Sequence, residues 1–91
     1  MEKVRKHIIF SGHVQGVGFR WHAQNAASAY GLTGWVENLF DGTVEMEVQG
    51  TLPAIEKMLL YLGNARFVRI DSIEQKNIPL QEESSFRVRG Y

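Results

Sequence analysis

The sequence predicts an α+β domain in which two helices cover one face of an antiparallel sheet. Three observations predict it: two segments repeat apolar residues at helical spacing, four others have strand composition, and an Asp-Gly pair joins the central two as a hairpin. The chain has 91 residues, enough for one compact domain and too few for two ordinary ones. We therefore expect residues 1–91 to form one domain.

The first half of the chain predicts a strand followed by a helix. Residues 4–11 concentrate β-branched and aromatic side chains, which is typical of a strand. Over residues 19–30 apolar positions recur mostly three or four apart, and Gly31 then supplies the left-handed conformation in which helices often end. The apolar face expected of this helix is Phe19, Ala23, Ala26, Ala27 and Tyr30.

The middle of the chain predicts a hairpin. Apolar and polar side chains alternate cleanly over residues 43–49, as they do in a strand with one buried face. Residues 33–39 precede it as the partner strand, and Asp41-Gly42 lies between them as the turn. Asp41 is therefore interpreted as a turn residue and not as a catalytic acid.

A second helix is expected after the hairpin. Thr51 is its candidate N-cap, and Pro53 falls in the first turn, where a missing N–H is tolerated. Gly63-Asn64 should end the helix. Its expected buried stripe is Ile55, Leu59 and Leu62.

The end of the chain predicts two strands separated by a loop. Residues 67–74 have strand composition, whereas residues 75–85 are polar, contain Pro79 and are expected to form the connecting loop. Residues 86–89 alternate apolar side chains with arginine and predict a short extra C-terminal strand. The order β-α-β-β-α-β, with right-handed crossovers and a central hairpin, corresponds to the ferredoxin-like sandwich.

Composition excludes several classes of protein. Ten Lys and Arg balance ten Asp and Glu, which disfavours a nucleic-acid binder. The chain has no cysteine, so disulfides and thiolate chemistry are excluded and a reducing interior is favoured. The longest apolar run, residues 58–62, is far shorter than the roughly 20 residues of a membrane span or the ~7–15 of a signal peptide. We expect a cytoplasmic monomer that binds neither nucleic acid nor membrane.

The segment between the first strand and the first helix is the strongest candidate for a site. It holds Gly12, Gly16 and Gly18, whose backbone can direct successive N–H groups into one anion-binding concavity. The helix start adds unpaired N–H groups and a positive dipole end, and Arg20 adds a planar set of donors. The spacing matches neither the Walker loop nor the dinucleotide fingerprint. Residue spacing alone leaves two interpretations open: a phosphate site, or a simple turn with a solvated Arg20.

Two motifs resemble those of the acylphosphatase family. Residues 12–20 read Gly-His-Val-Gln-Gly-Val-Gly-Phe-Arg and are similar to the family's Gly-x-Val-Gln-Gly-Val-x-Phe-Arg at every fixed position. Residues 34–50 are similar to its second motif, Gly-aromatic-Val-x-Asn-x-x-x-Gly-x-Val-x-x-x-x-x-Gly. The resemblance covers essentially the whole chain and is densest over residues 9–50.

The resemblance implies an enzyme that cleaves acyl phosphates to carboxylate and phosphate, without metal, cofactor or covalent intermediate. It implies that Arg20 and the loop amides hold the phosphoryl group, and that Asn38 positions the attacking water. An acyl phosphate has a good leaving group, so positioning and charge stabilisation can supply most of the catalysis. The implied substrate-binding residues are Gln15, Gly16, Val17, Gly18, Phe19 and Arg20, and the implied catalytic residues are Arg20 and Asn38.

The sequence departs from the family pattern at two positions. Glu37 stands before the motif asparagine, where the family often has a basic or uncharged residue; on a regular strand it faces away from Asn38. Gly90 intervenes between Arg89 and Tyr91, which leaves the position of the C-terminal carboxylate open.

Two other functions would fit parts of this pattern. An RNA-recognition module shares the element order, but its third strand needs stacking aromatics, which residues 43–49 lack. A non-catalytic domain that binds phosphate or carbamoyl phosphate would use the same loop and would leave Asn38 without a necessary role.

Histidines and tryptophans offer weaker candidates. His7, His13 and His22 lack the spacing of a helical zinc motif, so we expect no metal site. Trp35 is expected in the core, as an aromatic on a central strand usually is. Trp21 either flanks the acyl end of a substrate or packs on the sheet, and the sequence does not decide between the two.

Overall fold

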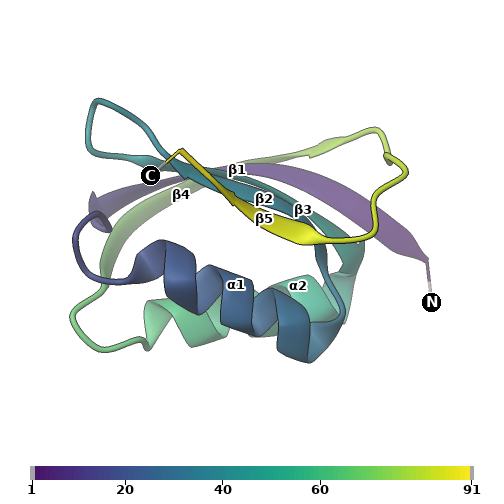
Figure 1. The fold of residues 1–91 in the computed structure, drawn as a ribbon, viewed down its shortest axis with the longest axis horizontal. Helices are drawn as coiled ribbons and strands as arrows, with labels where there is room; N and C mark the ends of the chain where they lie inside the picture. Colours follow the sequence, from purple (N-terminus) through teal and green to yellow (C-terminus); the bar gives the residue numbers. More distant parts are fainter. Residues whose placement is uncertain (1, 91) are drawn as a thin grey trace.

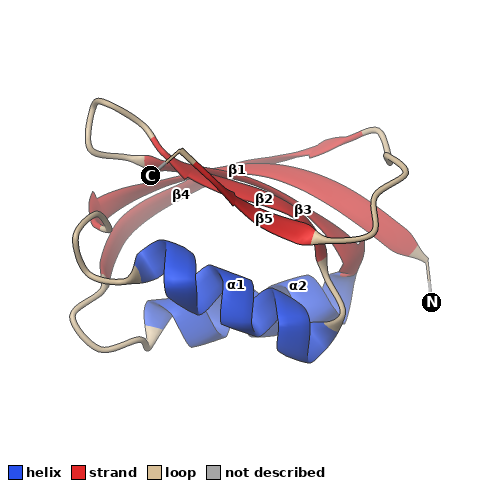
Figure 2. Cartoon of the chain, in the orientation of Figure 1, coloured by secondary structure: helices blue, strands red, loops and turns tan. Residues whose placement is uncertain are grey.

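The computed structural model describes residues 2–90 as two layers, with both helices below one sheet (Figures 1 and 2). The sheet order is β4-β1-β3-β2-β5. No helix among these residues is long and apolar enough to cross a membrane. The elements are β1 (Lys3–His13), α1 (Phe19–Tyr30), β2 (Thr33–Asn38), β3 (Val44–Thr51), α2 (Leu52–Gly63), β4 (Arg69–Ile78) and β5 (Phe86–Arg89). The predicted ferredoxin-like arrangement with an additional C-terminal strand is confirmed.

The sheet is mixed, which corrects the expectation of a purely antiparallel one. The neighbouring pairs among β1 to β4 are antiparallel, but β5 lies parallel to β2, with Gly34 opposite Phe86. β4 ends beside Arg5, near the start of β1, and the chain then crosses the sheet to the edge where β2 begins. A strand that enters from that end has to run in the direction of β2.

The hydrophobic core lies between the sheet and the helices. Phe10 of β1 and Phe19 of α1 meet edge to face with ring centroids 4.9 Å apart, and three alanines let α1 approach the sheet closely. The structure differs from the predicted helix faces in two details. Tyr30 is exposed, and in α2 Met58 is fully buried whereas Leu59 packs against the core only partly buried.

β4 differs most from its predicted bounds. Phe67 has a φ of 70°, in the left-handed region, so the strand begins two residues later at Arg69. The strand also continues to Ile78 through residues expected to be loop. These polar residues pair with β1 along an edge of the sheet, where backbone hydrogen bonds hold a strand that buries few side chains.

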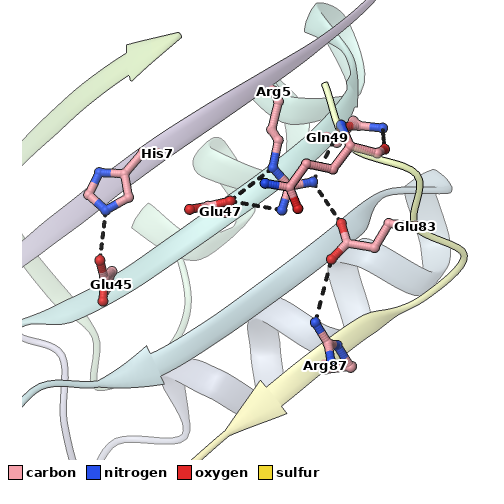
Figure 3. Close-up of polar contacts among 8 residues, drawn as sticks. Arg5, His7, Glu45, Glu47, Gln49, Glu83 and Arg87 are labelled. Carbon is pink, nitrogen blue, oxygen red and sulfur yellow. Dashed lines mark hydrogen bonds and ion pairs between the residues drawn. The ribbon is translucent and has the colours of Figure 1, made fainter. Parts of the chain in front are cut away.

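The face of the sheet opposite the helices carries a cluster of charged residues around Arg5 (Figure 3). The Arg5 side chain is fully buried and donates to Glu47 at 2.9 Å, to Glu83 at 2.7 Å and to Gln49 at 3.2 Å. Burial lowers the pKa of the Arg5 guanidinium, but its hydrogen bonds to Glu83 and Glu47 outweigh burial and raise the pKa above the ordinary value. No feature of the sequence had singled out Arg5.

Residues 79–85, which we call the strap, cover this cluster. Gln49 Nε2 donates to the Gln81 carbonyl at 2.8 Å, and the Gln81 N–H donates back to Gln49 Oε1 at 2.9 Å. Glu83 reaches from the strap to Arg5, and its other carboxylate oxygen lies 3.6 Å from Arg87 of β5. The cluster therefore fixes the path that leads into β5.

Candidate active site

Three parts of the chain meet at one end of the sheet, at the left of Figure 1. They are the β1–α1 loop with the first turns of α1, the end of β2 and the end of β5. Between them lies a cavity of about 380 Å³. Its lining comprises Val14, Gly16 and Gly18 of the loop, Phe19, Arg20, Trp21 and Gln24 of α1, Asn38 of β2 and Val88 of β5.

Gly16 and Gly18 of the loop are required by backbone conformation and not by lack of room. Gly16 has a φ of 74° and Gly18 a φ of 80°. No atom lies within 4 Å of a Cβ built on Gly16, and the nearest to one on Gly18 is a ring carbon of His22 at 3.8 Å. Left-handed residues set between ordinary ones turn successive N–H groups toward one side, which produces an anion-binding concavity.

The two helices differ at their N-termini. In α2 the Thr51 hydroxyl accepts a hydrogen bond from the Ala54 N–H, and Pro53 has no N–H to satisfy. In α1 the N-cap is Gly18, which has no side chain to cap the first turn. The first backbone bond within α1 comes from His22 to the Gly18 carbonyl at 2.9 Å, so the N–H groups before it are available to an anion.

Gln15 ties the loop to the hairpin between β2 and β3. Its Nε2 donates to the carbonyls of Leu39 at 2.6 Å and Thr43 at 2.8 Å. The sequence-based hypothesis assigned Gln15 a backbone contact with phosphate, and it did not include this side-chain clamp. Nothing in the local pattern reports it, because Gln15 and its partners are 24 and 28 residues apart.

Arg20 is positioned by a backbone carbonyl. Its Nη1 donates to the Arg89 carbonyl at 3.1 Å, and no Asp or Glu within residues 2–90 pairs with it. Gly90, the next residue after Arg89, also lies close to this guanidinium: a Cβ built on Gly90 would be 3.9 Å from Arg20 Nη1. The C-terminal carboxylate belongs to Tyr91, which lies outside the described residues. Most donors of Arg20 are therefore not engaged by the described part of the chain.

Asn38 brings an acceptor into the cavity. Its Oδ1 is buried and accepts no hydrogen bond from residues 2–90. A buried oxygen without a donor costs about 1–3 kcal/mol, so such atoms usually mark a place where water or ligand binds. The structure brings Asn38, Arg20, Gly16 and Gly18 to one cavity. Of the other proposed residues, Phe19 also lines it, whereas Gln15 and Val17 do not.

Glu37 lies outside this cavity, as its strand position predicts. The carboxylate of Glu37 is 3.1 Å from Arg89 Nε. The Arg89 guanidinium in turn lies 4.1 Å above the ring of Trp35. Trp35 is buried, as expected for an aromatic residue on a central strand, but it lies outside the cluster that fills the space between the sheet and the helices.

The three histidines do not form a site together. His7 pairs with Glu45 at 2.7 Å on the open face, His22 lies 3.2 Å from the Tyr61 hydroxyl, and His13 is exposed. Within residues 2–90 there is no group of three or more His, Asp or Glu side chains that could hold a metal.

Comparison with known proteins identifies the family. The sequence profile of the acylphosphatase family matches residues 6–88. The chain belongs to the acylphosphatase family. An acylphosphatase from Leuconostoc mesenteroides is 42% identical to it over 81 residues, which cover 87% of this chain and 90% of the relative.

Solved structures have the same fold as this member of the acylphosphatase family. The crystal structure of acylphosphatase from Bacillus subtilis matches with a TM-score of 0.89 and 31% identity, over 96% of this chain and 99% of that one. Full-length HypF in its phosphate- and nucleotide-bound form matches with a TM-score of 0.88 and 30% identity. That match covers 98% of this chain but 12% of HypF, so HypF contains the fold as a small part of a longer chain.

Proposed function

We propose that this protein hydrolyses the carboxyl–phosphate bond of acyl phosphates, with Arg20 and the glycine loop holding the phosphoryl group and Asn38 positioning water. Family membership supports the activity. The observation that carries the assignment of residues is one cavity that combines uncapped N–H groups, Arg20 and the buried, unpartnered Asn38 Oδ1.

Binding of the phosphoryl group uses charge and backbone dipoles. In this proposal the phosphoryl group is bound by the N–H groups around Gly16 and Gly18, which line the cavity, and by those of the first turn of α1, at the positive end of the helix dipole. Arg20 adds planar donors that can bind two phosphoryl oxygens at once. Because the Arg89 carbonyl already orients the guanidinium, little side-chain freedom remains to be lost when the substrate binds.

Asn38 orients the nucleophile. Its Oδ1 accepts a hydrogen bond from a water molecule and thereby directs a lone pair of that water at phosphorus. An amide is not a useful base at neutral pH, so the water proton passes to a phosphoryl oxygen of the substrate. As the new P–O bond forms, the P–O bond to the acyl group breaks, and its electron pair leaves on the carboxylate. Substrate and water thus become carboxylate and inorganic phosphate.

The rival function, a non-catalytic anion-binding domain, uses the same loop but not Asn38. The experiment compares wild type, Asn38→Ala and the exposed control Asn25→Ala for hydrolysis of benzoyl phosphate, followed by ultraviolet absorbance in the presence of EDTA. We expect turnover by wild type and control and at least about a hundredfold loss in Asn38→Ala. Phosphate affinity, measured by calorimetry, should be similar in all three.

Two results would contradict the proposal. If wild type binds phosphate but does not hydrolyse the substrate, the anion-binding function replaces it; if Asn38→Ala retains full turnover, the role of Asn38 is wrong. Loss of activity in EDTA would show that a metal takes part. The monomeric state, the absence of nucleic-acid binding and the cytoplasmic location stay predictions.

A further inference from the structure

Trp21 stands at the mouth of the cavity and is not needed for the core. Its side chain is 63% exposed although it lines the cavity together with Arg20 and Asn38. The structure therefore excludes packing on the sheet, one of the two possibilities that the sequence left open.

The indole of Trp21 packs against a row of two further aromatic rings. Its ring stands edge to face with His22 at 5.1 Å, and the His22 ring stands edge to face with Tyr61 at 5.7 Å. His22 Nδ1 also lies 3.2 Å from the Tyr61 hydroxyl, which links this row of rings to α2. An aromatic ring supported in this way loses little conformational freedom when a ligand packs against it.

The mouth of the cavity carries apolar surface, although its lining also includes the buried Val14 and Phe19 and the exposed Gln24. Asn38 Oδ1 is buried, whereas Trp21 and Val88, which is 38% exposed, line the same cavity with partly open apolar surface. Arg20 is the one charged side chain among the lining residues. Because the phosphoryl group occupies Arg20 in the proposed function, an acyl group with a charge of its own would find no second charged side chain among the lining residues.

In-line displacement decides which end of the substrate meets Trp21. The water and the leaving carboxylate lie on opposite sides of phosphorus, because the entering and breaking P–O bonds are roughly collinear. Water held by the buried Asn38 oxygen attacks from inside, so the acyl group points outward to the mouth. We propose that Trp21 is a specificity-determining residue that selects apolar, and above all planar aromatic, acyl groups.

This inference rests on the proposed function and is tested with two substrates. We compare kcat/KM for benzoyl phosphate and acetyl phosphate in wild type, Trp21→Ala and Trp21→Phe, with Leu60→Ala as control. Leu60 is also helical and is 69% exposed, but it does not line the cavity. Trp21→Ala should lower the ratio of benzoyl to acetyl phosphate kcat/KM about tenfold. Trp21→Phe should retain most of that ratio and Leu60→Ala all of it.

A binding measurement separates failure of this inference from failure of the proposed function. Calorimetry compares phenacylphosphonate with acetonylphosphonate, two non-hydrolysable analogues that differ only in the aryl or methyl end. We expect the wild type to bind the aryl analogue more tightly, and Trp21→Ala to lose that preference while its phosphate affinity stays unchanged.

The outcomes are distinct. Equal losses with both substrates in Trp21→Ala, or no preference for the aryl analogue in the wild type, would overturn the role of Trp21 and leave hydrolysis intact. If the wild type hydrolyses neither substrate, the proposed function fails, and the analogues still decide whether Trp21 selects aromatic groups.

Discussion

Two regions of this molecule are each built around one arginine, and they treat it in opposite ways. Arg5 is fully buried, and carboxylates of Glu47 and Glu83 neutralise it on the open face of the sheet (Figure 3). Arg20 is partly exposed at one end of the sheet, and its one described acceptor is an uncharged carbonyl. Arg5 thus serves the fold, whereas Arg20, in the function proposed above, keeps its positive charge for the phosphoryl group of a substrate.

The contrast has an electrostatic cause. A carboxylate beside Arg20 would occupy the donors that a phosphoryl group needs and would repel that group. Glu37 could have done this, but it lies on the other face of β2 and pairs with Arg89. The buried guanidinium of Arg5 needs counter-charges, because an unpaired charge away from water is costly.

The largest effect is expected from substitution of Arg20. Arg20→Ala should lower kcat/KM for an acyl phosphate by about 10²–10³-fold and weaken phosphate binding, because it removes charge and directed donors from the phosphoryl group. Arg20→Lys should recover little, since an ammonium does not reproduce the planar guanidinium. Steady-state kinetics and calorimetry measure these losses. The unfolding midpoint should hardly move, and a large drop in stability would contradict the division of roles.

The second largest effect is expected from substitution of Arg5. Arg5→Ala should lower the free energy of unfolding by about 2–3 kcal/mol, because it leaves Glu47 and Glu83 without their counter-charge. Denaturant titration measures the loss. Adding Glu47→Gln and Glu83→Gln to Arg5→Ala should restore part of it, and kcat of the folded protein should stay close to wild type. An equal loss in the triple variant would mean that buried charge is not the cause.

A smaller effect tests how the two regions are joined through β5. Arg89→Ala removes a cation–π contact with Trp35 and an ion pair with Glu37, together worth about 1 kcal/mol of stability. The Arg89 carbonyl that holds Arg20 remains, so we expect KM to rise only a few-fold with kcat nearly unchanged. Arg87→Ala is the matched control on the same strand. If Arg89→Ala leaves KM unaltered, the side-chain contacts of Arg89 do not help to position Arg20.

The smallest effect concerns the hairpin beside the site. Hydrogen bonds from the side chain and then the backbone N–H of Thr43 favour ionised Asp41 and lower the pKa of its carboxyl below the ordinary value. Such a group stabilises the fold above its unfolded-state pKa, and that stability is lost as pH falls through the lower folded-state pKa. Asp41→Asn should therefore reduce the thermal midpoint slightly at neutral pH and not at all in strong acid. A difference that persists in acid would contradict this account.

Much of the architecture was predictable because it is local. Side-chain periodicity indicated both helices. The residue types of Thr51 and of Asp41-Gly42 indicated the cap of α2 and the turn of the hairpin. Simple alternation along β2 predicted that Glu37 faces away from Asn38, and its ion pair with Arg89 confirms this. The predicted end of β4 was wrong because backbone pairing to β1 can hold an edge strand that has few apolar residues. The predicted start was wrong because Phe67 adopts a left-handed conformation, which is uncommon for phenylalanine.

The candidate site divides in the same way. The glycine spacing, Arg20 and Asn38 stand in two short motifs, so the order of residues along the chain is enough to predict them. Other contacts join residues that are 24 to 78 positions apart. They are the hydrogen bonds of Gln15 to the hairpin, of Arg20 to the Arg89 carbonyl and of Arg5 to its three acceptors. Only the packed sheet brings such partners together, because hydrogen bonds and ion pairs depend on distances in space and leave no periodic trace along the chain.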